Sequence, residues 1–265
     1  MTHQDVISRL LESYAPLPFM KSCDGYKYGD PNGMCTGVVT SCALTVDVIR
    51  EAARLGCNLI VVHEPCFYTH MDDTEWLAED PVYREKTALL DAHGMAVWRD
   101  HDHMHAHRPD EIMTGVLQEL GWDIYAEKDP RRVTLPETTL RELVQHLADR
   151  LHLRTGRVVG NMDARVSRIA FCGHIFPSWD EKERDKTLIL ARDDVDVLIP
   201  GELIDWTTVE YARDAAQLGR NKAIIQVGHF NWEEPGMKYL AEKIQRQNPE
   251  LAVHFVPSGD AYQFV

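Results

Sequence analysis

The sequence predicts an α/β protein of two α/β domains with mainly parallel sheets, in which the second domain is inserted into the first. Short apolar runs that suit buried strands alternate along most of the chain with amphipathic stretches of helical period, and this alternation is typical of a parallel sheet covered by helices. The 265 residues, of which 44% are hydrophobic and 26% charged, can bury a sizeable core as one large or two medium domains.

The first half of the chain begins this alternation with a βαβ unit. A strand over 37–44 leads into a helix over 46–55, which Gly56 ends, and a second strand follows over 58–62. We then expect a helix that ends near Ala92, a strand over 95–99, a helix between Pro109 and Gly121, and a strand over 122–126.

The charged, proline-broken segment 128–132 is the expected crossover between the domains. A capping box at 139–142 opens a helix to about 151, followed by strands near 157–160, 165–172 and 195–200 and helices over 181–191 and 206–218. A strand over 222–227, a helix over 235–247 and a strand over 251–256 complete the chain. We therefore expect a metal-binding domain over 1–127 and 222–265, and a second domain over 128–221.

Composition and charge argue against several classes of partner. The formal net charge of −14 would repel nucleic acid and anionic lipid, so we expect neither nucleic acid nor a membrane as the partner. No apolar stretch reaches the roughly 18–20 residues that span a bilayer, and the first residues lack a signal-peptide pattern, so a cytoplasmic location is expected. The six cysteines show no C-x-x-C spacing and are expected to be reduced thiols, mostly packed in the core.

The sharpest candidate for a functional residue is His63, which ends an apolar run and is followed by Glu64 and Pro65. Ligands of open α/β sheets gather beyond the carboxyl ends of strands, and a turn there would let His63 and Glu64 serve two neighbouring metal ions. Taken alone, the pair is also explained by an imidazole that caps the strand beside a solvated carboxylate.

The segment after the strand over 95–99 carries four alternating histidines, namely His101, His103, His105 and His107. Neutral imidazole is a common ligand for Zn, Fe, Co and Ni, although a solvated histidine-rich loop would have the same composition. The H-x-H-x-D-H motif of metallo-β-lactamase-like hydrolases would need an aspartate where the chain has His105, so we set that family aside.

A third cluster, His229 and Glu233, follows the strand over 222–227. The spacing of four residues brings the two side chains together over one helical turn. Glu233 and Glu234 would also complement the dipole of a helix that begins at Pro235, but this leaves the histidine at the strand end unexplained. Structural histidines have no reason to recur at three strand ends, so the three clusters together predict one shared metal centre in a metalloenzyme with a small-molecule substrate.

The same residues carry a family resemblance over essentially the full length. The segments that carry it are 59–65, 97–105, 158–161, 168–173, 196–202 and 228–233, and they resemble the Nif-three-like family of dinuclear metal centre hexameric proteins, the GTP cyclohydrolase I type 2 homologues. Glu64 stands where that family has a second histidine, and His105 stands where it has an aspartate. The two departures compensate, so the numbers of imidazole and carboxylate donors are unchanged.

The resemblance implies a ring-shaped homohexamer and two divalent metal ions of the Zn, Fe, Mn, Co or Ni class. The ligands that it implies are His63, Glu64, His105, His229 and Glu233. His101 and His103 are then available either as hydrogen-bond donors to the ligands or as catalytic groups that transfer protons.

The resulting hypothesis is a dinuclear-metal-dependent hydrolase of the cyclohydrolase or amidohydrolase type, which cleaves a C–N bond in a small, cyclic, nitrogen-containing substrate. A non-catalytic metal-binding or regulatory scaffold is the alternative, and an open coordination position would distinguish the two, because catalytic sites keep one. A redox role for iron, with the Cys66 thiol close to His63, is a third possibility.

Overall fold

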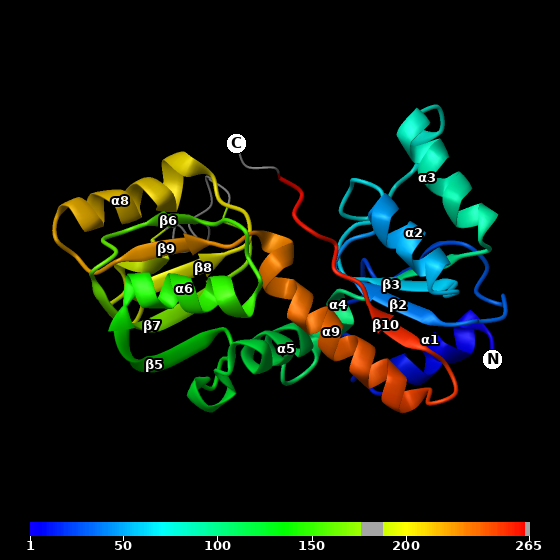
Figure 1. The fold of residues 1–265 in the computed structure, drawn as a ribbon, viewed down its shortest axis with the longest axis horizontal. Helices are drawn as coiled ribbons and strands as arrows, with labels where there is room; N and C mark the ends of the chain where they lie inside the picture. Colours follow the sequence, from blue (N-terminus) through cyan, green and yellow to red (C-terminus); the bar gives the residue numbers. More distant parts are fainter. Residues whose placement is uncertain (176–187, 263–265) are drawn as a thin grey trace. The chain divides into compact units, whose positions relative to one another are not determined.

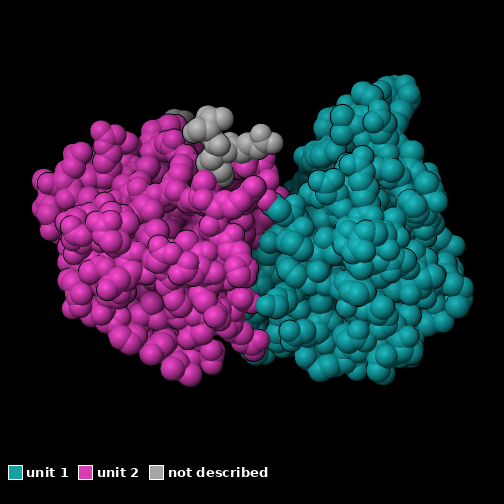
Figure 2. Space-filling view, viewed as in Figure 1, with its two compact units in different colours: residues 1–115, 233–259 teal, residues 116–232, 260–265 magenta. Residues whose placement is uncertain are grey.

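The computed structural model describes residues 1–175 and 188–262, which form two compact units (Figures 1 and 2). Unit 1 comprises Met1–Gly115 and Glu233–Gly259, and unit 2 comprises Val116–Trp232 and Asp260–Val265. Each unit contains a five-stranded sheet whose strands are mostly parallel, which confirms the predicted α/β class. The expected domain bounds, 1–127 with 222–265 and 128–221, stay a prediction.

Unit 1 is built on a sheet with the strand order β1-β4-β3-β2-β10. Its strands are β1 (Gly25–Tyr28), β2 (Val38–Ser41), β3 (Leu59–Val62), β4 (Ala96–Arg99) and β10 (Val253–Phe255). Its helices are α1 (His3–Leu11), α2 (Val46–Arg54), the 3₁₀ helix η1 (Glu75–Leu77), α3 (Pro81–Ala92), α4 (Asp102–Ala106) and the first part of α5 (Glu111–Leu120). The four strands from β4 to β10 are parallel, and only β1 at the edge is antiparallel.

Helices cover both faces of this sheet, and every residue of β2, β3 and β4 is buried. Ile60 and Val62 belong to one hydrophobic cluster with residues of α2 and α3. Figure 1 shows these two helices next to the sheet of unit 1. The opposite face receives helix α9 (His229–Gln247), whose Met237 carbonyl accepts a hydrogen bond of 2.8 Å from the Thr40 hydroxyl. Since both faces are buried, polar side chains gather at the strand ends.

Unit 2 repeats the same plan with the strand order β5-β7-β8-β9-β6. Its strands are β5 (Arg132–Thr139), β6 (Arg157–Val159), β7 (Arg165–Cys172), β8 (Val197–Pro200) and β9 (Ala223–Gln226). Its other elements are η2 (Asp123–Tyr125), α6 (Leu140–Arg150), η3 (Ile189–Ala191), the π-helical turn η4 (Asp205–Val209) and α8 (Glu210–Gln217). The three central strands, β7, β8 and β9, are parallel neighbours, and α6 packs on β5 while α8 packs on β9. In the part of the chain that the structure describes, no helix has the length and apolar character needed to cross a bilayer.

Several expected elements differ from the structure. The strand expected over 122–126 is wrong, because this segment contains the 3₁₀ helix η2. Trp122, which precedes η2, is buried, but Ile124 within it is 77% exposed. The helix expected from Pro235 begins six residues earlier, at His229, so this proline lies inside α9. The helix expected over 206–218 is split into η4 and α8, and most of the helix expected over 181–191 lies outside the described residues.

Two glycines let α5 and α9 approach closely within unit 1. A Cβ atom on Gly115 would lie 2.4 Å from the Pro235 carbonyl oxygen, and one on Gly236 would lie 2.5 Å from the Ile112 side chain. Only glycine fits where two helix backbones touch in this way. The contact fixes the part of α9 that carries Glu233.

Candidate metal centre

Backbone hydrogen bonds fix His63 at the carboxyl end of β3. The amides of His63 and Glu64 both donate to the Cys42 carbonyl, at 3.1 and 2.8 Å. On the other side, the Nε atom of Arg99 donates to the His63 carbonyl at 3.0 Å, and Arg99 is fully buried. The chain therefore turns sharply after the strand, as expected, and the His63 ring is held without exposure to solvent.

The hydrogen bond that His63 makes with its Nδ1 atom determines the state of its Nε2 atom. Nδ1 lies 3.1 Å from the Asp100 backbone carbonyl. A carbonyl only accepts, so Nδ1 carries the hydrogen, and in the neutral ring Nε2 presents a lone pair.

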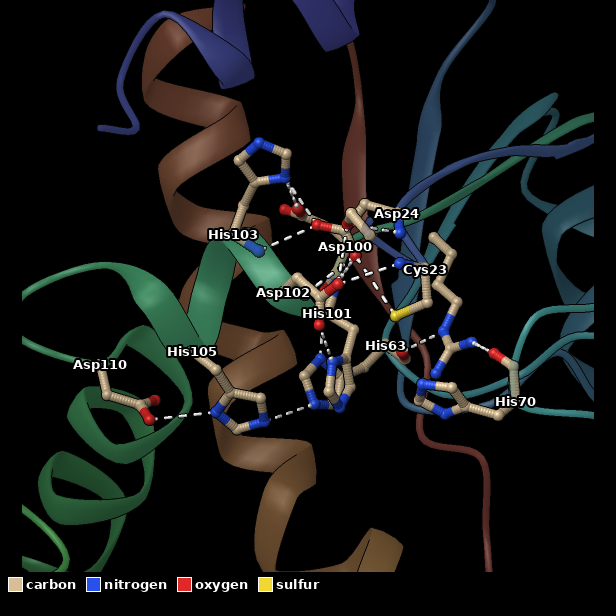
Figure 3. A network of polar contacts seen from close by, with 12 residues as sticks. Cys23, Asp24, His63, His70, Asp100, His101, Asp102, His103, His105 and Asp110 are labelled. Carbon is tan, nitrogen blue, oxygen red and sulfur yellow. Dashed lines mark hydrogen bonds and ion pairs between the residues drawn. The ribbon is translucent and has the colours of Figure 1, made fainter. Parts of the chain in front are cut away.

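A carboxylate fixes the hydrogen of His105 on Nδ1 in the same way. Its Nδ1 atom lies 3.0 Å from Oδ2 of Asp110, which accepts the Nδ1 hydrogen and leaves the Nε2 lone pair available. The Nε2 atoms of His63 and His105 face one another at 3.2 Å (Figure 3). Two nitrogens that bind one tetrahedral ion at 2.0–2.1 Å would lie about 3.3 Å apart. The pair therefore has the spacing of two ligands around one cation.

His101 joins this pair through the short helix α4. The His105 amide donates to the His101 carbonyl at 3.1 Å, so the two residues are one turn apart and share a face. The His101 ring stacks on His63 with centroids 4.6 Å apart and meets His105 edge to face at 4.8 Å. Burial lowers the pKa of His101, and the neighbouring His105 lowers it further, so the neutral ring is favoured.

His103 lies elsewhere, although it belongs to the same run of histidines. Two residues correspond to about 200° around a helix, so His103 points away from the face that His101 and His105 share. Figure 3 shows its ring turned from His63 towards Asp24, whose Oδ2 lies 2.6 Å from the His103 Nδ1 atom. This hydrogen bond raises the pKa of His103 despite partial burial.

Sequence reasoning missed Asp24, which organises the whole segment. Its carboxylate accepts hydrogen bonds from the backbone amides of three successive residues, His101, Asp102 and His103, at 2.8 to 2.9 Å. Burial alone would raise the pKa of Asp24, but its bonds to the His103 ring and to these amides lower it. No sequence pattern around position 24 predicts this role, because Asp24 and the amides that it contacts are nearly eighty residues apart in the sequence.

Sequence reasoning also missed Asp110, for which a local signal exists. Asp110 directly precedes α5, and its Oδ1 atom accepts from the Met113 amide at 3.1 Å, as a helix-capping aspartate does. Asp102 is the third carboxylate that sequence reasoning missed. Its Oδ1 atom lies 3.0 Å from the His101 Nδ1 atom. His101 and His105, whose rings contact the His63 ring, are thus each oriented by an acidic partner.

Two glutamates complete the candidate centre in unit 1. The buried Glu233 places its Oε2 atom 3.7 Å from the Nε2 atom of His63. The donor atoms of His63, Glu64 and Glu233 lie within 4.8 Å of one another, as do those of His63, His101 and His105. The structure therefore gathers four of the five predicted metal ligands, His63, Glu64, His105 and Glu233, around His63.

The fifth predicted ligand, His229, belongs to unit 2. There its Nδ1 atom lies 2.8 Å from Oε1 of Glu202, beside His174. The expectation that His229 shares ions with His63 stays a prediction.

Cys66, the residue considered for a redox role, lies in the hydrophobic core of unit 1. Burial raises the pKa of its thiol to about 12. Because the thiolate is the form that binds metals, this environment does not favour Cys66 as a ligand at neutral pH. All six cysteines are free thiols, as expected.

Comparisons with known proteins agree with the resemblance read from the sequence. The profile of the Duf34/NIF3 family (NGG1p interacting factor 3) matches residues 1–260. A GTP cyclohydrolase 1 type 2 homolog of Clostridium acetobutylicum is 24% identical over 253 residues, which cover 90% of this chain and 88% of the relative. One of Clostridium perfringens, with the same name, is 24% identical over 280 residues, which cover 98% of this chain and 97% of the relative.

Solved structures show the same fold. The crystal structure of a Bacillus cereus protein related to NIF3 superposes with a TM-score of 0.74 at 16% identity, covering 100% of this chain and 99% of the other. A Staphylococcus aureus protein gives a TM-score of 0.71, also at 16% identity, with the same coverage. Since the family profile spans nearly the whole sequence, the chain belongs to the Duf34/NIF3 family.

Proposed function

We propose that this protein is a dinuclear-metal-dependent hydrolase that cleaves a C–N bond in a small, cyclic, nitrogen-containing substrate. The observation that carries the proposal is the 3.2 Å approach of the His63 and His105 Nε2 atoms beside the carboxylates of Glu64 and Glu233. The names of the two clostridial relatives support the class of reaction.

The donor set fits divalent ions of the Zn, Fe, Mn, Co or Ni class, because it combines imidazole nitrogens with carboxylate oxygens. In this proposal His63 and His105 supply nitrogens, and Glu64 and Glu233 supply oxygens around the same His63. When bound, such ions would supply Lewis acidity, which activates water and polarises the bond to be cleaved.

The surrounding residues orient the histidine nitrogens that would bind the ions. Asp110 and the Asp100 carbonyl hold the hydrogens of His105 and His63 on Nδ1, so both Nε2 atoms stay available. The proton-transfer roles expected for His101 and His103 stay predictions. The variants His101→Gln and His103→Gln test the two roles separately. If His103 is only a structural partner of Asp24, its replacement will leave the shape of the pH–rate profile unchanged. If His103 transfers the proton, its replacement will remove one limb of that profile.

Metal content tests the centre directly. After loading with Zn²⁺ and removal of excess ion, His63→Ala and Glu233→Ala should each retain fewer ions per chain than the wild type. His93→Ala, which removes an exposed histidine of unit 1, is the matched control and should bind as the wild type does. Unchanged stoichiometry in both test variants would defeat the proposed centre.

Turnover tests the chemistry. Purine nucleotides and cyclic amides should be assayed with each of the five metals, and the hydrolysis we expect should disappear in His105→Ala. If the ions bind but no substrate is hydrolysed with any metal, a non-catalytic metal-binding scaffold is the better description.

We further propose that the chain assembles as a homohexamer, as the family resemblance implies. Sedimentation velocity would test this, because a hexamer of 30.3 kDa chains is far heavier than a monomer or dimer. A single species of monomer mass at micromolar concentration would contradict it.

A further inference from the structure

One exposed histidine beside the unit 1 centre has no part in the arrangement described above. His70 lies in the loop that joins β3 to η1, and its ring meets the His101 ring edge to face, with centroids 6.4 Å apart. Figure 3 shows the His70 ring next to that of His101, with His105 on the opposite side of His101. His70 is therefore placed to contact a small molecule bound at the centre.

The ring nitrogens of His70 differ from those of the other histidines around the centre. In His63, His101 and His105 the Nδ1 atom lies within 3.1 Å of a carbonyl or carboxylate oxygen. Among the described residues, neither nitrogen of the exposed His70 ring has a hydrogen-bond partner, and only its backbone is bonded. An imidazole with both nitrogens open to solvent offers hydrogen bonds to a ligand.

Hydrogen bonds fix the backbone that carries His70. The side chain of Arg99, only 1% exposed, donates from Nη1 to the His70 carbonyl at 2.5 Å and from Nε to the His63 carbonyl at 3.0 Å. The Asp72 amide donates to the Thr69 carbonyl at 3.0 Å, which closes a turn that has His70 at its second position. One buried guanidinium therefore fixes the position of His70 relative to His63.

The same loop holds an aromatic residue in an uncommon conformation. Tyr68 has a φ of +68°, in the left-handed region that bulky residues rarely adopt, and it is 56% exposed. The Lys86 Nζ atom donates to the Cys66 carbonyl at 2.7 Å and lies 5.2 Å from the centroid of the Tyr68 ring. The fold thus maintains a strained backbone that exposes a phenol and an imidazole two residues apart, and such strain is concentrated at ligand sites.

Basic side chains outnumber acidic ones around this loop. The Oδ2 atom of Asp72 lies 3.6 Å from Nη1 of Arg99 and 3.7 Å from Nζ of Lys27. Lys86 is a third basic residue, and all three basic side chains are largely buried. In a chain with a net charge of −14, this local excess of positive charge favours an anionic group of a ligand beside His70.

We propose that His70 is a substrate-binding residue of the unit 1 centre, and that its imidazole donates a hydrogen bond to an anionic oxygen group, such as a carboxylate, on the nitrogen-containing substrate. This inference rests on the proposed function, because it concerns the substrate of that centre. The carboxylates of Glu64 and Glu233 do not oppose it, since the ions that they bind would balance their charge. His70 thereby selects acidic substrates over neutral ones of the same ring.

The test compares two probes, dihydroorotate and dihydrouracil, which are cyclic amides that differ by one carboxylate. Titration calorimetry measures the binding of each probe to the zinc-loaded protein, so the readout does not require turnover. The wild type should bind dihydroorotate about tenfold more tightly than dihydrouracil, and His70→Ala should lose this preference while it binds dihydrouracil as the wild type does. The matched control is His93→Ala, which removes an exposed histidine of unit 1 at the end of α3 and should keep the preference.

Zinc content and thermal unfolding distinguish a contact with the substrate from a structural effect. His70→Ala should retain as many ions as the wild type and unfold at the same temperature, because only the backbone of His70 is hydrogen-bonded within the protein. Loss of zinc from this variant would make His70 part of the metal centre and refute the inference. If the wild type shows no preference for dihydroorotate, or if His70→Ala keeps it, the inference is refuted even where hydrolysis is observed. If His70 governs the preference but no cyclic amide is hydrolysed with any metal, only the hydrolase proposal fails.

Discussion

The substitution Asp110→Asn tests the argument about the imidazole hydrogens at the unit 1 centre. The Asp110 side chain is only 5% exposed, with Oδ1 on the Met113 amide at 3.1 Å and Oδ2 on the His105 Nδ1 atom at 3.0 Å. An amide that keeps the first bond turns its NH₂ group towards Nδ1, so that two donors oppose each other. His105 relieves this by moving its hydrogen to Nε2, where it points at the His63 Nε2 atom 3.2 Å away. A proton then occupies the position in which the metal ion would bind.

The expected magnitude follows from the loss of this orienting carboxylate. Partners of metal-binding histidines contribute 10–100-fold to affinity, or about 1.4–2.8 kcal/mol. Zinc affinity is measured by competition with a chelator, and the stability of the metal-free protein by urea unfolding. We expect Asp110→Asn to weaken zinc binding by this factor with little change in metal-free stability.

The matched control is Asp80→Asn. Asp80 caps α3 by accepting from the Tyr83 amide at 2.8 Å, in the same unit but without a histidine partner. It should leave zinc affinity unchanged. If Asp110→Asn also binds zinc as tightly as the wild type, the assignment of the Nε2 lone pairs is wrong.

Three further predictions concern stability. Burial raises the pKa of Asp196, but hydrogen bonds from the Arg168 guanidinium and from backbone amides lower this pKa below its ordinary 3.8. These hydrogen bonds therefore stabilise the fold above pH 3.8, and their contribution is lost as the pH falls below that value. The unfolding free-energy difference between wild type and Asp196→Asn should therefore shrink between pH 6 and pH 3, and a constant difference would contradict this. Gly115→Ala should destabilise by about 1–3 kcal/mol in urea unfolding, despite a better helix propensity, because its Cβ would lie 2.4 Å from a carbonyl oxygen of α9; no loss would refute the tight helix crossing. Arg99→Met should cost about 3 kcal/mol by leaving the buried Asp72 carboxylate, 3.6 Å away, less compensated, and adding Asp72→Asn should recover part of that loss; no recovery would argue against the ion pair.

The strands and helices that position the unit 1 centre could be read from the sequence because each is a simple apolar pattern. The run 59–62 is buried at every residue, and β3 lies within the range expected for it. The strand prediction for Trp122–Ala126 was wrong because two apolar residues in alternation resemble a strand. In the structure Gly121, with a φ of +69°, ends α5, and the chain then forms a single 3₁₀ turn. Short alternations carry too little information to separate these outcomes.

The candidate site was predictable where ligands follow strands, and not where partners come from elsewhere. His63 and Glu233 follow recognisable patterns, and they lie near each other in the structure. The separation of His101 from His103 depends on α4 being helical, whereas an extended loop would have placed both on one side. The sequence marks Glu202 only as part of a family-like segment, because nothing local reveals that two histidines contact it.

The hydrogen bonds that Asp24 accepts from three consecutive amides would affect how the proposed unit 1 centre discriminates among metal ions. Ordering a flexible backbone costs about 1–2 kcal/mol per residue, and here that entropy is lost during folding instead of when an ion arrives. An ion bound by the proposed centre would therefore meet a backbone that is already ordered. Ionic radius and preferred coordination number would then decide which element is accepted, because the ordered backbone adjusts little to suit a poor match.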